Sequence, residues 1–157
     1  MVWYTDLTPL DDSDPDDGLR AVGWLERGQS FITGQVDPAV YARLVELLKN
    51  PWEPSITRGF HECDLCLYRG EPGKRNLYVP TGGVVLVAPE LIAHYMNAHG
   101  YRPPDEFCAA VLTCPPMRSV SYFKALMAGA RTFMLAVTRA SPSEHAEPGA
   151  AADRPRE

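Results

Sequence analysis

Two cysteines and two histidines carry the clearest chemistry in this sequence. Cys63 and Cys66 are separated by two residues, a spacing that holds two sulfur ligands on one tight turn. His94 and His99 follow after a gap of 27 residues and are themselves five positions apart. Two thiolates with two imidazoles are the ligand set of a tetrahedral Zn²⁺ site. The pattern therefore predicts that these four side chains hold one zinc ion.

A third histidine leaves the fourth ligand open. His61 lies two residues before Cys63 and could replace a helical histidine, or hydrogen bond behind one. The spacing favours His99 as the ligand and His61 as its neighbour. Glu62 and Asp64 offer carboxylate oxygen in the same segment, and we interpret both as surface residues.

The ligand types also bear on whether such a zinc ion is structural or catalytic. Two cysteines and two histidines would close the shell, which is typical of structural zinc, whereas catalytic zinc keeps an open position. A metalloprotease would need a second histidine where Leu65 follows His61-Glu62. The sequence also lacks the ordered motif of the zinc deaminases. If His61 or His99 were not a ligand, an open position would remain. The acids that could then act as a base are Glu62, Glu90 and Glu106.

Two other motifs are present only in part. A thioredoxin-type cysteine pair opens a helix after a strand, and the residues around Cys63 and Cys66 do not resemble a helix start. The acidic loop 11–17 begins like a calcium-binding loop at Asp12. However, Asp17 stands where that loop needs glycine and Gly23 where it needs glutamate. We interpret residues 11–17 as a solvated loop.

The histidines lie in a segment that predicts a helix from Pro89-Glu90 to Gly100. Proline and an acid are favoured in a first helical turn, and glycine after the last turn. Positions five apart lie about 140° apart on a regular helix, so His94 and His99 can converge only if the last turn loosens. The adjacent Gly100 makes this possible.

Other elements follow from apolar periodicity and turn residues. A helix should start at Pro38, with Asp37 as its N-cap, and end before Pro51. A hairpin should join residues 76–79 to 84–87 around a glycine turn. The further strands and helices that we expect cover residues 3–4, 22–25, 30–33, 105–112 and 118–139.

Composition and charge narrow the class of protein. The chain has 157 residues, 45% hydrophobic and 22% charged, which is typical of a single globular domain. Its net charge of −5 includes six aspartates and no base in residues 1–17. The bases are scattered elsewhere, so we expect no nucleic-acid partner. No apolar run is long enough for a membrane span, and no export signal is apparent. We therefore expect a cytoplasmic protein whose four cysteines are thiols or metal ligands.

Several separated motifs resemble a known family. They cover residues 4–9, 22–25, 57–66, 88–95 and 99–107. Their order, with Gly-Phe-His-x-Cys-x-x-Cys before His-Tyr-x-x-x-His-Gly-Tyr-x-Pro-Pro-x-Glu-Phe, resembles a bacterial family of uncharacterised proteins that is common in actinobacteria. The resemblance covers roughly residues 3–112. The family has no assigned activity, so it supports the metal site and leaves the function open.

We predict one zinc-stabilised α+β domain over residues 1–139 and a disordered tail over residues 140–157. Its expected architecture is a small antiparallel sheet with helices, a zinc-finger-like ββα centre and a long C-terminal helix. The expected function is a non-catalytic binding or adaptor protein, immunity-type or regulatory, with a protein partner. The alternative is a small zinc-dependent hydrolase with an open metal position. An occupied fourth ligand position would exclude the enzyme, and a deep polar pocket facing the metal would exclude the binder.

Overall fold

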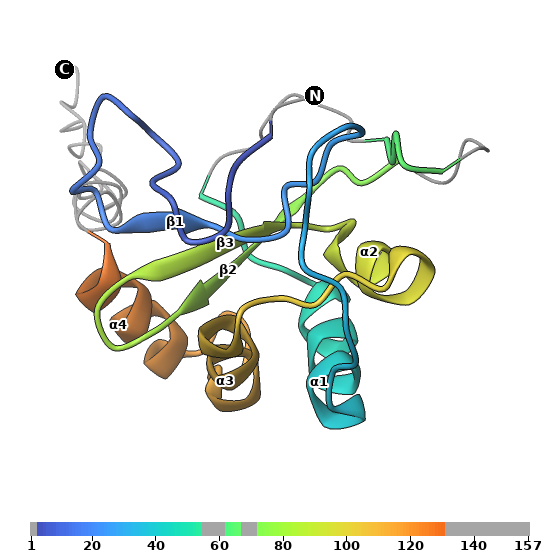
Figure 1. Cartoon of the computed structure of the whole chain (residues 1–157). Helices are drawn as coiled ribbons and strands as arrows, with labels where there is room; N and C mark the ends of the chain where they lie inside the picture. Colours follow the sequence, from blue (N-terminus) through green and yellow to red (C-terminus); the bar gives the residue numbers. More distant parts are fainter. Residues whose placement is uncertain (1–2, 55–61, 67–71, 131–157) are drawn as a thin grey trace, which may run out of the picture.

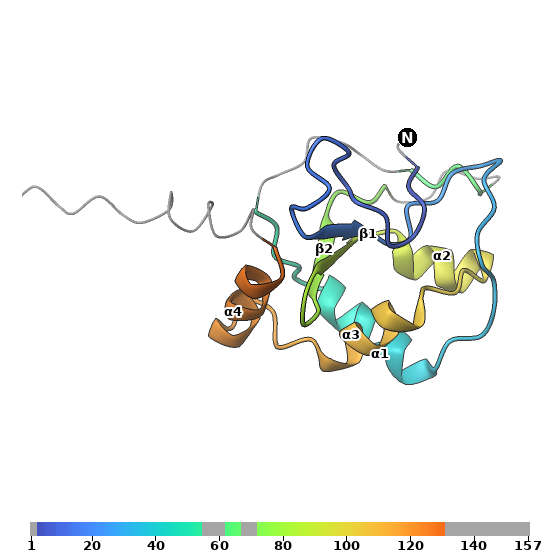
Figure 2. The same ribbon diagram turned by 60° about the vertical axis from the view of Figure 1, so that its left-hand side comes forward.

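The computed structural model describes residues 3–54, 62–66 and 72–130. It is an α+β structure, as predicted, with the helices on one side of a three-stranded sheet and residues 3–18 on the other (Figure 1, Figure 2). The elements in chain order are β1 (Leu19–Ala21), α1 (Pro38–Leu48), β2 (Asn76–Pro80), β3 (Val85–Pro89), α2 (Ile92–His99), α3 (Asp105–Thr113) and α4 (Val120–Gly129). None of the described helices has the length and apolarity that crossing a membrane requires.

The sheet is mixed rather than wholly antiparallel. Its strand order is β1-β3-β2, with β2 and β3 forming the predicted antiparallel hairpin. β1 instead runs parallel to β3, with Leu19 opposite Val85 and Ala21 opposite Val87. Parallel pairing needs a long connection, and the chain between β1 and β3 includes all of α1 and β2. Local sequence patterns do not specify such a distant pairing.

The predicted strands at 3–4, 22–25 and 30–33 are wrong. Residues 22–25 are buried but leave the sheet at Gly23, which has a positive φ of 73°. The Gly23 N–H donates to the Asp6 carboxylate and not to a strand. Residues 30–33 form only one isolated bridge, between Thr33 and Tyr101. Tyr4 packs its ring edge-on against Trp24, with 5.8 Å between ring centroids. Residues 22–25 are apolar because they line the core, not because they extend a ladder, whereas Trp3 and Ile32 are exposed.

The core lies between the hairpin and the helices. Every residue of β2 and β3 is buried. The hydroxyl of Tyr122 on α4 donates to the Tyr78 carbonyl at 2.7 Å, which fixes α4 against β2. The indole of Trp52 packs edge-on against Tyr78, Tyr122 and Phe123. Since buried aromatic side chains contribute most of the apolar area in such a core, this cluster anchors α4 to the sheet.

Helix boundaries follow the predicted signals at most ends. The Asp37 side chain accepts from the Ala39 N–H at 2.8 Å, and α1 starts at Pro38 as predicted. The predicted start of the second helix at Pro89-Glu90 is wrong, because Pro89 is the last residue of β3. α2 begins at Ile92, directly after Leu91. α4 begins after the N-cap Ser119 and ends at Gly129, with Ala130 extended. Residues 131–139 of the predicted long helix and the predicted tail 140–157 lie outside the described residues.

Candidate metal centre

Two segments far apart in the sequence supply the candidate ligands. Residues 62–66 hold Cys63 and Cys66 on one turn, and α2 carries His94 and His99. All four side chains are half-buried. α2 follows directly after β3, so the buried hairpin fixes where the two imidazoles lie.

The four ligand atoms converge. Cys66 Sγ lies 3.2 Å from His94 Nε2 and 3.3 Å from His99 Nε2. Cys63 Sγ lies 3.3 Å from His99 Nε2. All four atoms lie within 4.8 Å of one another, which is close enough to bind one metal ion. Tetrahedral Zn²⁺ with ordinary bond lengths would place sulfur and nitrogen about 3.5 Å apart, close to the distances observed.

Hydrogen bonding among these groups does not account for the arrangement as well as a metal does. A thiol has one proton, yet Cys66 Sγ faces two ring nitrogens, and His99 Nε2 faces two sulfurs. Not all these contacts can be hydrogen bonds at once. A cation at the centre would accept a lone pair from each of the four atoms.

The end of α2 brings the two histidines to the same side. Gly100 takes a left-handed conformation with φ of 63°, and its N–H reaches the carbonyl of Tyr95, five residues back. The Tyr101 N–H also bonds to Tyr95, at 3.1 Å. An α-helix closes over four residues, so this turn is wider than a regular one. The last turn of α2 is therefore loosened, as the convergence of His94 and His99 requires. The imidazole centroids of His94 and His99 lie 5.1 Å apart.

Arg27 holds the cysteine turn from outside. Its backbone N–H donates to Asp64 Oδ2 at 3.0 Å, and its Nε donates to the Asp64 carbonyl at 2.7 Å. Its Nη2 also reaches the Cys66 carbonyl at 3.3 Å. Asp64 is half-buried and bonded to Arg27, which corrects our prediction of a surface residue. The role of Arg27 could not be predicted from the sequence, because no local pattern connects residues 37 to 39 positions apart.

Burial favours the neutral forms of two of the candidate ligands. It raises the pKa of the Cys63 thiol and lowers the pKa of His94, which the neighbouring His99 lowers further. A neutral imidazole is the form that binds a metal, while a thiol must first lose its proton. Binding of a metal ion at this site would therefore release the proton of the Cys63 thiol.

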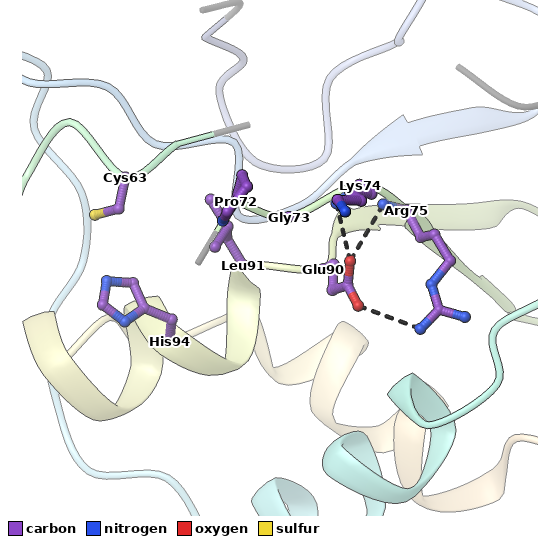
Figure 3. Close-up of a pocket in the computed structure, with 8 residues that line it drawn as sticks. All are labelled: Cys63, Pro72, Gly73, Lys74, Arg75, Glu90, Leu91 and His94. Atoms are coloured by element: carbon purple, nitrogen blue, oxygen red, sulfur yellow. Dashed lines mark hydrogen bonds and ion pairs between the residues drawn. The ribbon is translucent and has the colours of Figure 1, made fainter. Parts of the chain in front are cut away.

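A cavity of about 640 Å³ opens beside Cys63 and His94. Its polar groups do not face these two side chains: in Figure 3 the Glu90 carboxylate points toward Lys74 and Arg75, with Pro72 and Leu91 between. Glu90 Oε2 accepts from the N–H groups of Lys74 at 2.9 Å and Arg75 at 3.3 Å, and Oε1 faces Arg75 Nη2 at 3.3 Å.

The other predicted site residues lie apart from the cluster. Glu62 is exposed on the cysteine turn, and Glu106 is exposed in the first turn of α3. Neither belongs to the group of converging ligand atoms found among the described residues. His61, the alternative fourth ligand, lies outside the described residues.

The fold and the site together define a small α+β protein with a Cys₂His₂ cluster able to hold a metal ion. The chain belongs to a domain family of unknown function, DUF7919, whose profile matches residues 2–112. That range contains all four candidate ligands and agrees with the extent of the predicted resemblance. No curated protein and no solved structure matches the chain. The bacterial distribution of the family stays a prediction.

Proposed function

We propose that this protein is a zinc-stabilised, non-catalytic binding or adaptor protein. The observation that carries the proposal is the convergence of two sulfurs and two imidazole nitrogens within 4.8 Å. Sulfur favours zinc over the hard cations Mg²⁺ and Ca²⁺, which prefer oxygen ligands. Four protein ligands leave no open position for a substrate or an activated water, so the ion would be structural.

The position of the cluster supports a stabilising role. Among the described residues, the turn 62–66 is joined to the rest of the protein by the Arg27 hydrogen bonds and by the contacts of its cysteines with α2. An ion bound to all four side chains would link this turn to α2. Such a site does not exist in the unfolded chain, so the free energy of metal binding would add to the free energy of folding.

The alternative is a small zinc-dependent hydrolase, and the cavity beside Cys63 and His94 is the observation that favours it. Two features oppose it. His94 and His99 both approach the sulfurs, which leaves neither free as a catalytic group. Glu90, the candidate base that lines the cavity, already holds the start of β2 through Lys74 and Arg75. We therefore prefer a binding function, with a protein as the partner. We expect it to act in the cytoplasm, where metal-binding thiols stay reduced.

Metal analysis combined with two histidine variants tests the proposal. The purified protein should contain about one zinc ion per chain. His99→Ala should lose zinc and stability together, since it removes a ligand. His61→Ala should be milder, with at most a ~10–100-fold loss of zinc affinity. A protein without zinc, or a histidine variant that stays folded and zinc-loaded while a hydrolase activity of the wild type disappears, would contradict a structural site.

A further inference from the structure

A second concave surface lies between the N-terminal segment and residues 30–32, and none of the four candidate metal ligands lines it. It encloses about 360 Å³, a size suited to one or two side chains of a partner. We call this surface the N-terminal groove. Its lining residues are Trp3, Tyr4, Thr5, Asp6, Leu7, Leu25, Ser30, Phe31, Ile32 and Pro104.

Exposed apolar side chains gather at this groove. Among the described residues, six large hydrophobic side chains are exposed, and three of them line it: Trp3 at 37%, Leu7 at 37% and Ile32 at 65%. The other three are Val45, Leu112 and Val120, which lie on α1, α3 and α4. An apolar patch on a rigid surface, with a tryptophan in it, is typical of a protein-binding site.

The groove is held in shape by the core beneath it. Phe31 packs edge-on against the buried Tyr101, at 6.2 Å between ring centroids. Leu7 has a φ of 67°, unusual for a residue with a side chain, and its N–H bonds to the Ala21 carbonyl at 2.7 Å. Such a conformation persists only where the surroundings fix it. The exposed Leu7 side chain is therefore displayed by a rigid backbone.

One carboxylate lines the groove. Asp6 contributes a half-buried carboxylate, whose Oδ2 accepts a hydrogen bond from Tyr101 at 2.9 Å. The described residues that line the groove include no lysine or arginine, and Arg102, two positions before the lining residue Pro104, pairs with Asp105 at 2.7 Å. The chain that continues from the groove adds five further aspartates and no base before residue 18.

We propose that the N-terminal groove binds a segment of a partner protein in which an apolar side chain lies next to lysine or arginine. The apolar side chain would cover Trp3, Leu7 and Ile32. The adjacent cation would lie against Asp6. This inference rests on the proposed binding function and names the partner chemistry, while its surface is separate from the metal centre.

Selection of random dodecapeptides displayed on phage, against the full-length zinc-loaded protein, tests the inference. The selected peptides should share an apolar residue beside lysine or arginine. A synthetic copy of the best peptide should bind at least ~10-fold more weakly to Ile32→Asp, which places a charge in the groove. Val120→Asp is the matched control, because Val120 is exposed on α4, and it should bind within about 2-fold of wild type. Raising the salt concentration should weaken binding.

Each outcome decides the question. No enriched peptide, enriched peptides without a base, or binding that Ile32→Asp leaves unchanged would overturn the proposal. So would a dimer in sedimentation that Ile32→Asp dissociates, because the occupant would then be a second copy of the chain. Zinc content measured on the same samples separates this failure from that of the proposed function. Ile32→Asp should keep its zinc, whereas a zinc-free protein that binds the peptide would contradict the metal site alone.

Discussion

Cys66 is the residue on which the metal centre depends most. Its sulfur is within 3.3 Å of both helical imidazoles, while the Cys63 sulfur has a close contact with only one of these imidazoles, that of His99. The ligand types and their spacing could be predicted from the sequence, because a cysteine turn and a helical histidine pair are both local patterns. Arg27 could not be predicted, since its contacts with Asp64 and Cys66 depend on how two distant loops meet.

The first prediction concerns Cys66→Ser. A hydroxyl is a much poorer zinc ligand than a thiolate, so the variant should lose most of its zinc and unfold at a lower temperature. Elemental analysis and thermal unfolding followed by circular dichroism measure the two effects. Cys108→Ser is the control, because Cys108 is equally half-buried but lies on α3, outside the cluster. Equal zinc content in both variants would refute the assigned ligand.

Arg27→Ala provides the second prediction. Arg27 touches no ligand atom, but it fixes the carbonyls of Asp64 and Cys66. Its loss should leave the turn more mobile before metal binding and lower the zinc affinity by about 10-fold, as for other residues that position metal ligands. Competition with a chromophoric chelator measures the affinity. Arg102→Ala, which removes an exposed arginine with an i,i+3 ion pair, should change it little. Similar zinc affinities in both variants would show that Arg27 does not help to position the metal ligands.

At the scale of elements, sequence patterns located the helices better than the strands. Helix starts and ends were set by residues such as Asp37, Pro38 and Gly100, whose effects act within one turn. β1 was missed because its partner is β3, more than sixty residues further on. The apolar run 22–25 was mistaken for a strand, because burial alone gives the same pattern. Local periodicity does not determine which distant strands pair with one another.

The close approach of α4 to the hairpin gives the third prediction. A Cβ at Gly129 would lie 2.9 Å from the Val84 carbonyl oxygen, a backbone atom that cannot move aside easily. Gly129→Ala should therefore destabilise the protein by about 1–3 kcal/mol, although alanine favours helix by about 1 kcal/mol. Chemical denaturation measures the change. Gly83→Ala, where nothing lies within 4 Å, should have a much smaller effect. A stabilised Gly129→Ala variant would show that α4 can move away.

In the molecule as a whole, two groups of contacts connect distant parts of the chain to the end of α2. At the metal centre, residues 62–66 meet His94 and His99. Beside it, Asp6 accepts from the Gly23 N–H at 2.8 Å and from the hydroxyl of Tyr101, 95 residues away. The α+β class and the meeting of the two cysteines with the two histidines could be predicted from the sequence. The contacts of Asp6 could not, because they depend on how the N-terminal segment packs against Gly23 and Tyr101.

The fourth prediction concerns the pH dependence that Asp6 gives to the whole fold. Burial raises the pKa of Asp6, more than its hydrogen bonds from Gly23 and Tyr101 lower it. The folded state therefore holds the Asp6 proton more tightly than the unfolded state. Its contribution to stability is complete below the unfolded pKa of 3.8 and is lost as the pH rises through the raised folded pKa. Asp6→Asn cannot lose a proton in this way.

The melting temperature of Asp6→Asn relative to wild type should therefore rise as the pH increases from below 3.8 through the raised pKa of folded Asp6. Asp11→Asn is the control of opposite sign. Ser13 hydrogen bonds lower the pKa of the exposed Asp11, so its contribution is present above the unfolded pKa and is lost as the pH falls. Release of a bound metal ion in acid would affect all three proteins alike and cancel in the differences. Parallel profiles for Asp6→Asn and wild type would mean that the Asp6 carboxylate is as well solvated in the folded protein as in the unfolded chain.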